Sequence, residues 1–127
     1  MLNRHEYRER IVFALYQHLL LRKDLRECFE NNIEPEDFDD FTKAILEDLL
    51  LNKENYIEKL SVYLVKWSFD RLNLVEQAIL LASTSELLLR LNDNAVVIDE
   101  AIRITKKYCD EDSYKYINGV LDSLCKN

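Results

Sequence analysis

Four basic side chains stand close together near the start of the sequence, namely Arg4, His5, Arg8 and Arg10. Arg4 and Arg8 are four residues apart, so they share one face if the segment is helical. Tyr16 follows on the same segment. Guanidinium groups bind phosphate oxygens in pairs, and aromatic rings stack on unpaired bases. The pattern favours contact with single-stranded RNA, and an ordinary solvated basic face is the alternative interpretation.

A second basic and aromatic cluster lies nearer the C-terminus and fits the same two interpretations. Its members are Arg103, Lys106, Lys107, Lys115 and Tyr116. The net charge of the whole chain is nevertheless −7. Residues 1–26 carry six Arg or Lys against three Asp or Glu, whereas residues 27–60 carry three against eleven. Such a chain is poorly suited to coating nucleic acid, but it can bind one locally and offer its acidic face to a basic partner.

The patterns that would indicate catalysis are missing from the sequence. His5 and His18 are too far apart for a helical metal-binding pair, and neither belongs to an HExxH motif. A single glycine leaves no glycine-rich phosphate loop and no GxSxG nucleophile turn. Helix capping is enough to explain the close acids Asp110 and Asp112. We therefore expect no enzymatic activity, no metal site and no cofactor.

Three cysteines, an odd number without a CxxC pair, indicate reduced thiols in a cytoplasmic protein. No signal peptide is visible near the start of the sequence. No apolar run approaches the roughly 20 residues that a membrane span needs. We therefore expect a cytoplasmic location and no membrane partner.

Hydrophobic residues recur at helical spacing along nearly the whole chain. One glycine and one proline also argue against an all-β fold, which needs many tight turns. We predict an all-α protein with about seven helices and short loops. The expected helices cover approximately 4–22, 24–29, 35–49, 52–67, 73–88, 98–105 and 113–124. Asn73 with Glu76, and Asp24 with Glu27, have the spacing of helix-capping pairs.

The single glycine, Gly119, falls inside the last predicted helix, where it costs roughly 1 kcal/mol relative to alanine. Two explanations are open. The preferred one is a close crossing with another helix, in which case Gly119→Leu destabilises the fold by about 1–3 kcal/mol through overpacking. The other is a stretch of backbone that is left open for a ligand.

Several blocks of this sequence stand out by their order and spacing, namely Trp67–Leu72, Leu74–Leu80, Ser85–Leu87, Val97–Ile102, Asp112–Asp122 and, near the start, Ala14–Tyr16. Together these blocks resemble the NusB family of transcription antitermination factors. The resemblance extends over residues 4–124, so we expect one NusB-like domain over 1–127. It implies two small helical subdomains, formed by helices one to three and helices four to seven.

The resemblance also implies a function and a set of contact residues. It implies binding to the boxA element of ribosomal RNA leader transcripts, as a heterodimer with the ribosomal protein NusE and with other Nus factors on RNA polymerase. The implied RNA-binding residues are Arg4, His5, Arg8, Arg10, Tyr16, Asp112, Ser113, Lys115, Tyr116 and Asn118. The implied partner-binding residues are Asp70, Arg71 and Glu76, and acids there suit a basic ribosomal protein.

Two glutamates, Glu6 and Glu9, dilute the basic run, which predicts weaker and less salt-sensitive RNA binding by the isolated chain. Arg8→Ala is expected to weaken RNA binding and to lower the salt slope by about one. The alternative function is a helical protein–protein adaptor that has lost RNA recognition.

Overall fold

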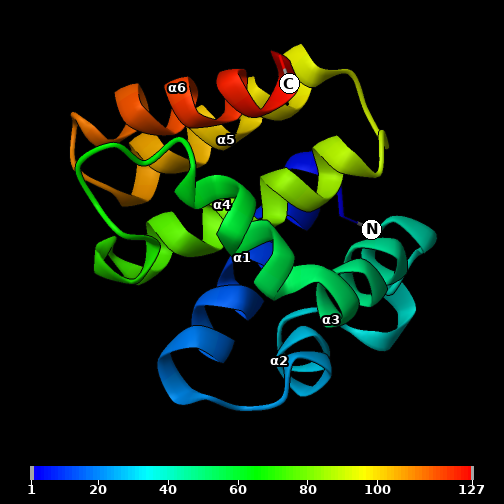
Figure 1. Cartoon of the computed structure of the whole chain (residues 1–127). Coiled ribbons are helices and arrows are strands. Elements are labelled where there is room, and N and C mark those ends of the chain that lie inside the picture. The colour runs from blue at the N-terminus through cyan, green and yellow to red at the C-terminus, as the bar shows by residue number, and fades with distance from the viewer. Residues whose placement is uncertain (1, 127) are drawn as a thin grey trace.

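Helices joined by short loops make up the computed structural model, which describes residues 2–126 and has no strand among them (Figure 1). The α-helices are α1 (Arg4–Leu21), α2 (Leu25–Asn32), α3 (Asp40–Ser61), α4 (Leu74–Leu88), α5 (Asn94–Tyr108) and α6 (Ser113–Lys126). Two short 3-10 helices, η1 (Pro35–Asp37) and η2 (Phe69–Arg71), precede α3 and α4. The predicted all-α fold is confirmed.

Side-chain caps begin several of these helices. At α4, the Asn73 side chain accepts a hydrogen bond from the backbone N–H of Glu76, and the Glu76 carboxylate accepts one from the backbone N–H of Asn73. This reciprocal pair satisfies two N–H groups that the helix itself leaves unpaired. Asn3 and Glu6 cap α1 in the same way, and Asp24 caps α2. The predicted start of α4 and the predicted cap at Asp24 are confirmed.

The predicted helix break at Asn52 is wrong. α3 continues through this position for 22 residues, because the Asn52 side chain donates a hydrogen bond to the Asp48 carboxylate one turn earlier (3.0 Å). Pro35 does stand at a first helical position, but it begins η1, and α3 starts only after Asp39, its N-cap. Residues 2–126 therefore form six α-helices where about seven were expected.

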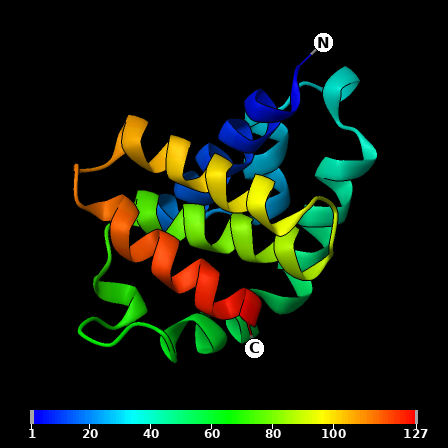
Figure 2. The same ribbon diagram turned by 90° about the horizontal axis from the view of Figure 1, so that it is seen from above.

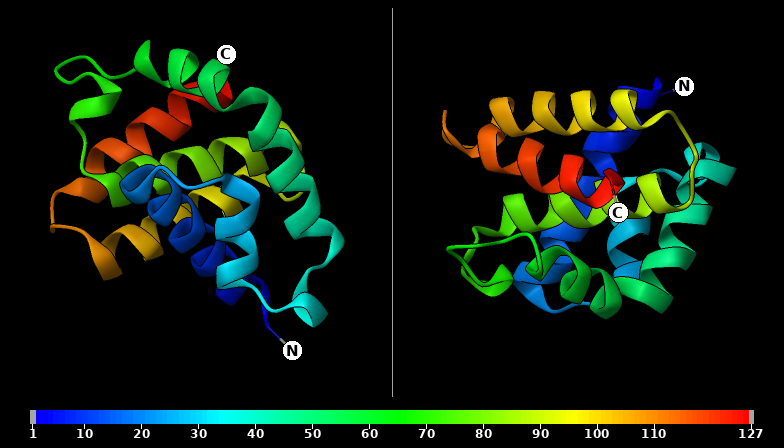
Figure 3. Two further views of the ribbon diagram at one scale, coloured as in Figure 1. Left: turned by 90° about the horizontal axis from the view of Figure 1, so that it is seen from below. Right: turned by 45° about the horizontal axis from the view of Figure 1, so that its top comes forward.

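The continuous helix α3 also connects the two halves of the molecule. Its first turns lie near α2, and its last turns lie beside α6 (Figure 3). The boundary expected between the two subdomains, close to residue 50, therefore falls in the middle of a helix.

α4 forms the centre of the core. Every residue from Glu76 to Leu87 is buried, and α4 contacts α1, α3, α5 and α6 (Figure 2). A helix that is buried on all sides, as α4 is over this stretch, belongs at such a central position. α5 and α6, joined by a short link, lie antiparallel on one side of α4.

The close helix crossing predicted at Gly119 is wrong. Gly119 is exposed, and a Cβ atom added to it would meet no neighbouring atom within 4 Å. Overpacking by a larger side chain therefore has no basis, and the explanation that fits is an open stretch of backbone. Gly119 instead lines a surface groove together with the loop that follows α3.

Gly119→Ala is expected to raise the free energy of unfolding by up to about 1 kcal/mol. The reason is that alanine removes the conformational cost of a helical glycine and its methyl group enters open space. Urea unfolding followed by circular dichroism measures the change. Lys115→Ala, at an exposed position of the same helix, serves as a control with little change. A loss of stability in Gly119→Ala would contradict the open environment.

Candidate nucleic-acid interface

Arg8, the predicted phosphate ligand at the centre of the basic run, points into the protein. Its Nε and Nη2 atoms donate hydrogen bonds to the two carboxylate oxygens of Glu86 on α4, at 2.9 and 2.7 Å. The residue is only 9% exposed, and Glu86 is buried as well. A phosphate could reach this guanidinium only by disrupting a buried ion pair. We therefore regard Arg8 as a positioning residue that attaches α1 to α4.

The other basic residues of α1 also have partners within the chain. The Nδ1 atom of His5 lies 2.5 Å from the carboxylate of Glu100 on α5. Arg10 is half-buried and donates a hydrogen bond to the backbone oxygen of Asn32 (3.2 Å). These contacts hold both side chains against the fold and limit their freedom to contact an RNA.

Arg4 keeps more of its charge accessible to solvent than the other cations of this run. Its guanidinium lies 4.0 Å from the ring centroid of Phe41 and 3.3 Å from the Asp39 carboxylate, and 43% of its side chain is exposed. Thr42, at the first turn of α3, and Arg4 together hold the pKa of Asp39 below its usual range against the opposing effect of burial. Tyr16, further along α1, is half-buried against the core.

Glu9, which the sequence suggested only as a dilution of the basic run, connects α1 to the end of α5. It accepts hydrogen bonds from Lys107 (3.0 Å) and from the hydroxyl of Tyr108 (2.8 Å). Burial favours a higher pKa for the Glu9 carboxyl, but these two hydrogen bonds, together with the charges of Lys107 and His5, outweigh burial and lower the pKa. No pattern in the sequence indicates this contact, because its members are 98 and 99 positions apart.

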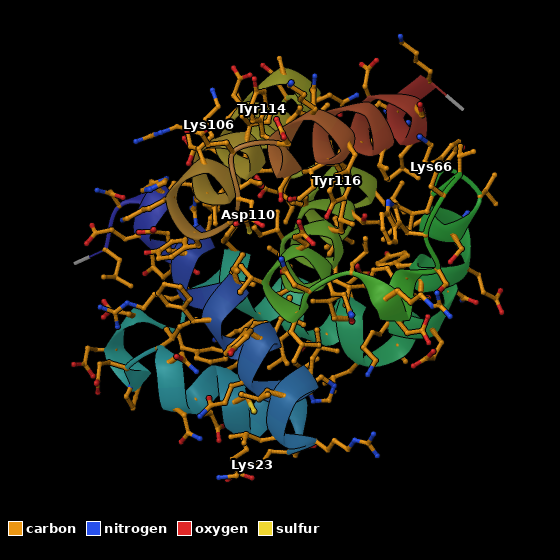
Figure 4. The ribbon with its side chains drawn as sticks, turned by 90° about the vertical axis from the view of Figure 1, so that its left-hand side faces the viewer. Lys23, Lys66, Lys106, Asp110, Tyr114 and Tyr116 are labelled. Atoms are coloured by element: carbon orange, nitrogen blue, oxygen red, sulfur yellow. The ribbon has the colours of Figure 1, made fainter. Side chains whose placement is uncertain are left out.

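The predicted RNA-facing residues near the last helix lie around the start of α6. Asp112 is exposed and pairs with Lys115 at 3.4 Å, and Asn118 is exposed one turn further on. Ser113 is buried at the first position of the helix. Figure 4 shows this side of the molecule, with Asp110, Tyr114 and Tyr116 labelled.

A pocket of about 390 Å³ brings the two predicted sets of residues together. Arg71 and Glu76 from the predicted partner set meet Asp112, Ser113 and Tyr116 from the predicted RNA set. The remaining lining residues are Trp67, Leu72 and Asp110. The fold explains this meeting, because α4 packs against α6 and η2 directly precedes α4 in the chain.

Tyr116 adds a hydroxyl group to this pocket, next to the Glu76 carboxylate. Its hydroxyl is buried and has no hydrogen-bonding partner of good geometry within residues 2–126. Burial raises the pKa of Tyr116, and the neighbouring Glu76 carboxylate raises it further. The tyrosine therefore stays protonated and can donate a hydrogen bond to a bound group.

The three predicted partner residues differ in accessibility. Asp70 and Arg71, in η2, are exposed. Glu76 is buried and forms the N-terminal capping pair of α4, and it lines the pocket.

An apolar groove adjoins this pocket, and it was not predicted. The loop after α3 forms one wall and α6 forms the other, and the lining residues are Tyr63, Leu64, Val65, Lys66, Trp67, Tyr116, Gly119, Val120 and Ser123. Val65 is 93% exposed and Trp67 is 56% exposed, which is unusual for such large apolar side chains. The apolar run Val62–Trp67 next to a lone helical glycine was the signal that could have indicated the groove.

Residues 2–126 offer neither a cluster of metal ligands nor a membrane-spanning helix. No three His, Cys, Asp or Glu side chains in this stretch are grouped in a way that could hold a metal ion. In the same stretch, no helix has both the length and the apolar character needed to cross a membrane.

Comparisons with known proteins agree with the fold and cover nearly the whole chain. The model of the NusB family matches residues 5–126. A curated relative named transcription antitermination protein NusB, from Sulfurimonas denitrificans, is 35% identical over 100% of this chain and 99% of its own length. Relatives with this name are transcription factors, which supports the expectation that the chain has no enzymatic activity.

Solved structures show the same similarity. The structure of NusB from T. maritima superimposes with a TM-score of 0.88 and 34% identity, and it covers 100% of this chain and 94% of that chain. A chain in a crystal structure of the antitermination factors NusB and NusE in complex with dsRNA has a TM-score of 0.83 over 97% of this chain and 96% of that chain. At 24% identity, the second match shows the shared fold.

Proposed function

Because the chain belongs to the NusB family of transcription antitermination proteins, we propose that it binds boxA RNA together with NusE. In this proposal the pair recognises the boxA element in the leader of ribosomal RNA transcripts and supports processive transcription of those genes. It acts with other Nus factors on RNA polymerase, in the cytoplasm.

The pocket between η2, α4 and α6 is the observation that carries the proposal. Residues implied in RNA contact and residues implied in partner contact line the same pocket. An RNA bound at Asp112–Asn118 would therefore lie against a protein bound at Asp70 and Arg71. A surface shared in this way explains why the two proteins would bind the RNA better together than singly.

We assign the RNA contacts on α1 mainly to Arg4, with smaller contributions from His5, Arg10 and Tyr16. At α6 we assign them to Lys115, Tyr116 and Asn118, around the exposed carboxylate of Asp112. Arg8 and Ser113 are buried, so in this proposal they position the neighbouring contact residues and do not contact the RNA themselves.

The partner side of the proposal combines charge with apolar area. Exposed Asp70 offers a negative charge to a basic ribosomal protein, and the adjoining groove offers Val65 and Trp67.

A titration of labelled boxA RNA tests the proposal. The equimolar pair with NusE is expected to bind at least tenfold more tightly than either protein alone, and more tightly to boxA than to a scrambled RNA of equal length and composition. Fluorescence anisotropy at two salt concentrations measures the dissociation constants. Equal affinity of the pair for the scrambled RNA would overturn the sequence-selective function.

A protein–protein adaptor without RNA recognition is the second candidate. The observation that favours it is that His5, Arg8 and Arg10 all have partners inside the fold. It predicts that NusE binds normally and that boxA RNA causes no change in anisotropy at low salt.

A further inference from the structure

Two aromatic rings on the surface, far apart in sequence, lie against each other where α1 passes the end of α5. Phe13 of α1 and Tyr108 of α5 have ring centroids 5.3 Å apart and an interplanar angle of 83°. Phe13 is 37% exposed and Tyr108 is 40% exposed. An edge-to-face pair of this kind is favourable, yet both rings still present area to solvent.

Contacts from Glu9 and Lys107 fix the position of Tyr108. The Tyr108 hydroxyl donates a hydrogen bond to the Glu9 carboxylate (2.8 Å), and Lys107 donates to the same oxygen (3.0 Å). The Lys107 ammonium also lies 5.3 Å from the centroid of the Tyr108 ring. A ring held in place in this way loses little conformational freedom when another ring stacks on it.

Three exposed cations, Arg103, Lys106 and Lys107, lie on the same end of α5 as Tyr108. Arg103 pairs with Glu100 and Lys107 pairs with Glu9, both at 3.0 Å, and in each pair the basic side chain is the more exposed member. A second cation–aromatic pair follows at the start of α6, where Lys106 lies 4.6 Å from the ring centroid of Tyr114 (Figure 4). Exposed aromatic rings between cations match the surfaces that bind single-stranded nucleic acid. The same cations would repel a basic protein partner.

We propose that Phe13 and Tyr108 form a stacking platform for an unpaired base of the RNA, and that Lys107 contacts the neighbouring phosphate. The proposal rests on the proposed function and adds a contact that joins the basic part of α1 to the RNA-facing start of α6. Stacking tolerates any base, so the platform adds affinity and leaves sequence selection to other residues. It adds little to binding of duplex RNA, in which the faces of the bases are already stacked.

The test measures boxA RNA binding by the NusE complex with substitutions on the platform. Phe13→Ala and Tyr108→Leu are each expected to raise the dissociation constant about tenfold without changing its salt dependence. Lys107→Gln is expected to lower the salt slope by about one.

Tyr108→Phe, which keeps the ring and loses the hydroxyl, is expected to retain most of the affinity. Leu51→Ala, at an exposed leucine of α3, is the matched control and should bind like the wild type.

Three results would overturn the platform, and they differ from failure of the function itself. If the wild-type complex selects boxA while Phe13→Ala and Tyr108→Leu bind equally well, the platform is wrong and the proposed function stands. If the substitutions weaken NusE binding by the same factor, the surface belongs to the protein partner. An equal loss of affinity for duplex RNA would exclude stacking. If the wild-type complex binds no RNA, both proposals fail.

Discussion

Arg8→Ala is expected to lower the free energy of unfolding by about 3–5 kcal/mol, a large fraction of the stability of a small domain. The cause is that the Glu86 carboxylate would stay buried in α4 without the guanidinium that neutralises it. Asn92 would still donate one hydrogen bond to Glu86 (2.9 Å), but it brings no charge. Denaturant unfolding of the two proteins measures the difference.

Arg4→Ala is the matched control on the same helix, because Arg4 forms a partly exposed ion pair. Its loss is expected to cost less than about 1 kcal/mol. Glu86→Ala should be about as damaging as Arg8→Ala, and the double variant should be less damaging than the sum of the two. Where Arg8→Ala is still folded, the salt slope of RNA binding should stay as in the wild type. If Arg8→Ala were as stable as the wild type and its salt slope of RNA binding were lower by one, Arg8 would contact a phosphate as the sequence predicted.

Asp48→Ala is expected to destabilise the protein by about 3 kcal/mol. The Asp48 carboxylate is buried and accepts hydrogen bonds from the hydroxyls of Tyr56 (2.7 and 2.8 Å) and Ser85 (2.7 Å), and from the amide of Asn52. Alanine would leave the two hydroxyls buried without an acceptor, and it would remove the link between α3 and α4. Thermal and urea unfolding both report the loss.

Glu54→Ala is the control for this substitution, because Glu54 is a solvent-exposed carboxylate on the same helix. It should change stability by no more than about 0.5 kcal/mol. The loss of stability in Asp48→Asn should lie between the losses in Asp48→Ala and Glu54→Ala. The amide keeps one acceptor oxygen, but its NH2 group would face other hydrogen-bond donors. If Asp48→Ala were as stable as Glu54→Ala, the buried network would not contribute to the fold.

The helices could be predicted because their signals are local. Hydrophobic spacing and the capping residues Asn73, Glu76 and Asp24 act over three or four positions, and each marks a helix where the structure has one. Asn52 misled because asparagine is a common residue at the start of a helix, whereas here its side chain donates to a buried carboxylate within a continuous helix. The sequence shows that Asp48 stands four positions earlier, but it does not show that Asp48 is buried.

The interface was harder to predict, because the orientation of a charged side chain depends on distant residues. Arg8 has the same spacing from Arg4 whether it faces solvent or Glu86, and Glu86 is 78 positions away. The hydrogen bond between Glu9 and Tyr108 was missed for the same reason, because the two residues are 99 positions apart. Family resemblance named some of the residues that line the pocket, such as Arg71, Glu76 and Tyr116, but only the folded chain shows which of them are buried and which are accessible.

Gly119 illustrates the limit of a compositional argument. Helical spacing alone could not distinguish a tight crossing from an open groove wall at this position. The neighbours that decide the question, Tyr63 to Trp67, lie more than fifty positions earlier in the chain.

The uninterrupted course of α3 has a consequence for how the molecule can be divided. Two fragments separated near residue 51 would each contain about half of a 22-residue helix, and isolated helices of that length are marginal in water. Hydrogen exchange should then report one opening event shared by both ends of α3, because neither half keeps a complete helix without the other. The two halves are therefore not interchangeable modules, and a chimaera that joins halves of two relatives must match the whole of α3 as well as the loops around it.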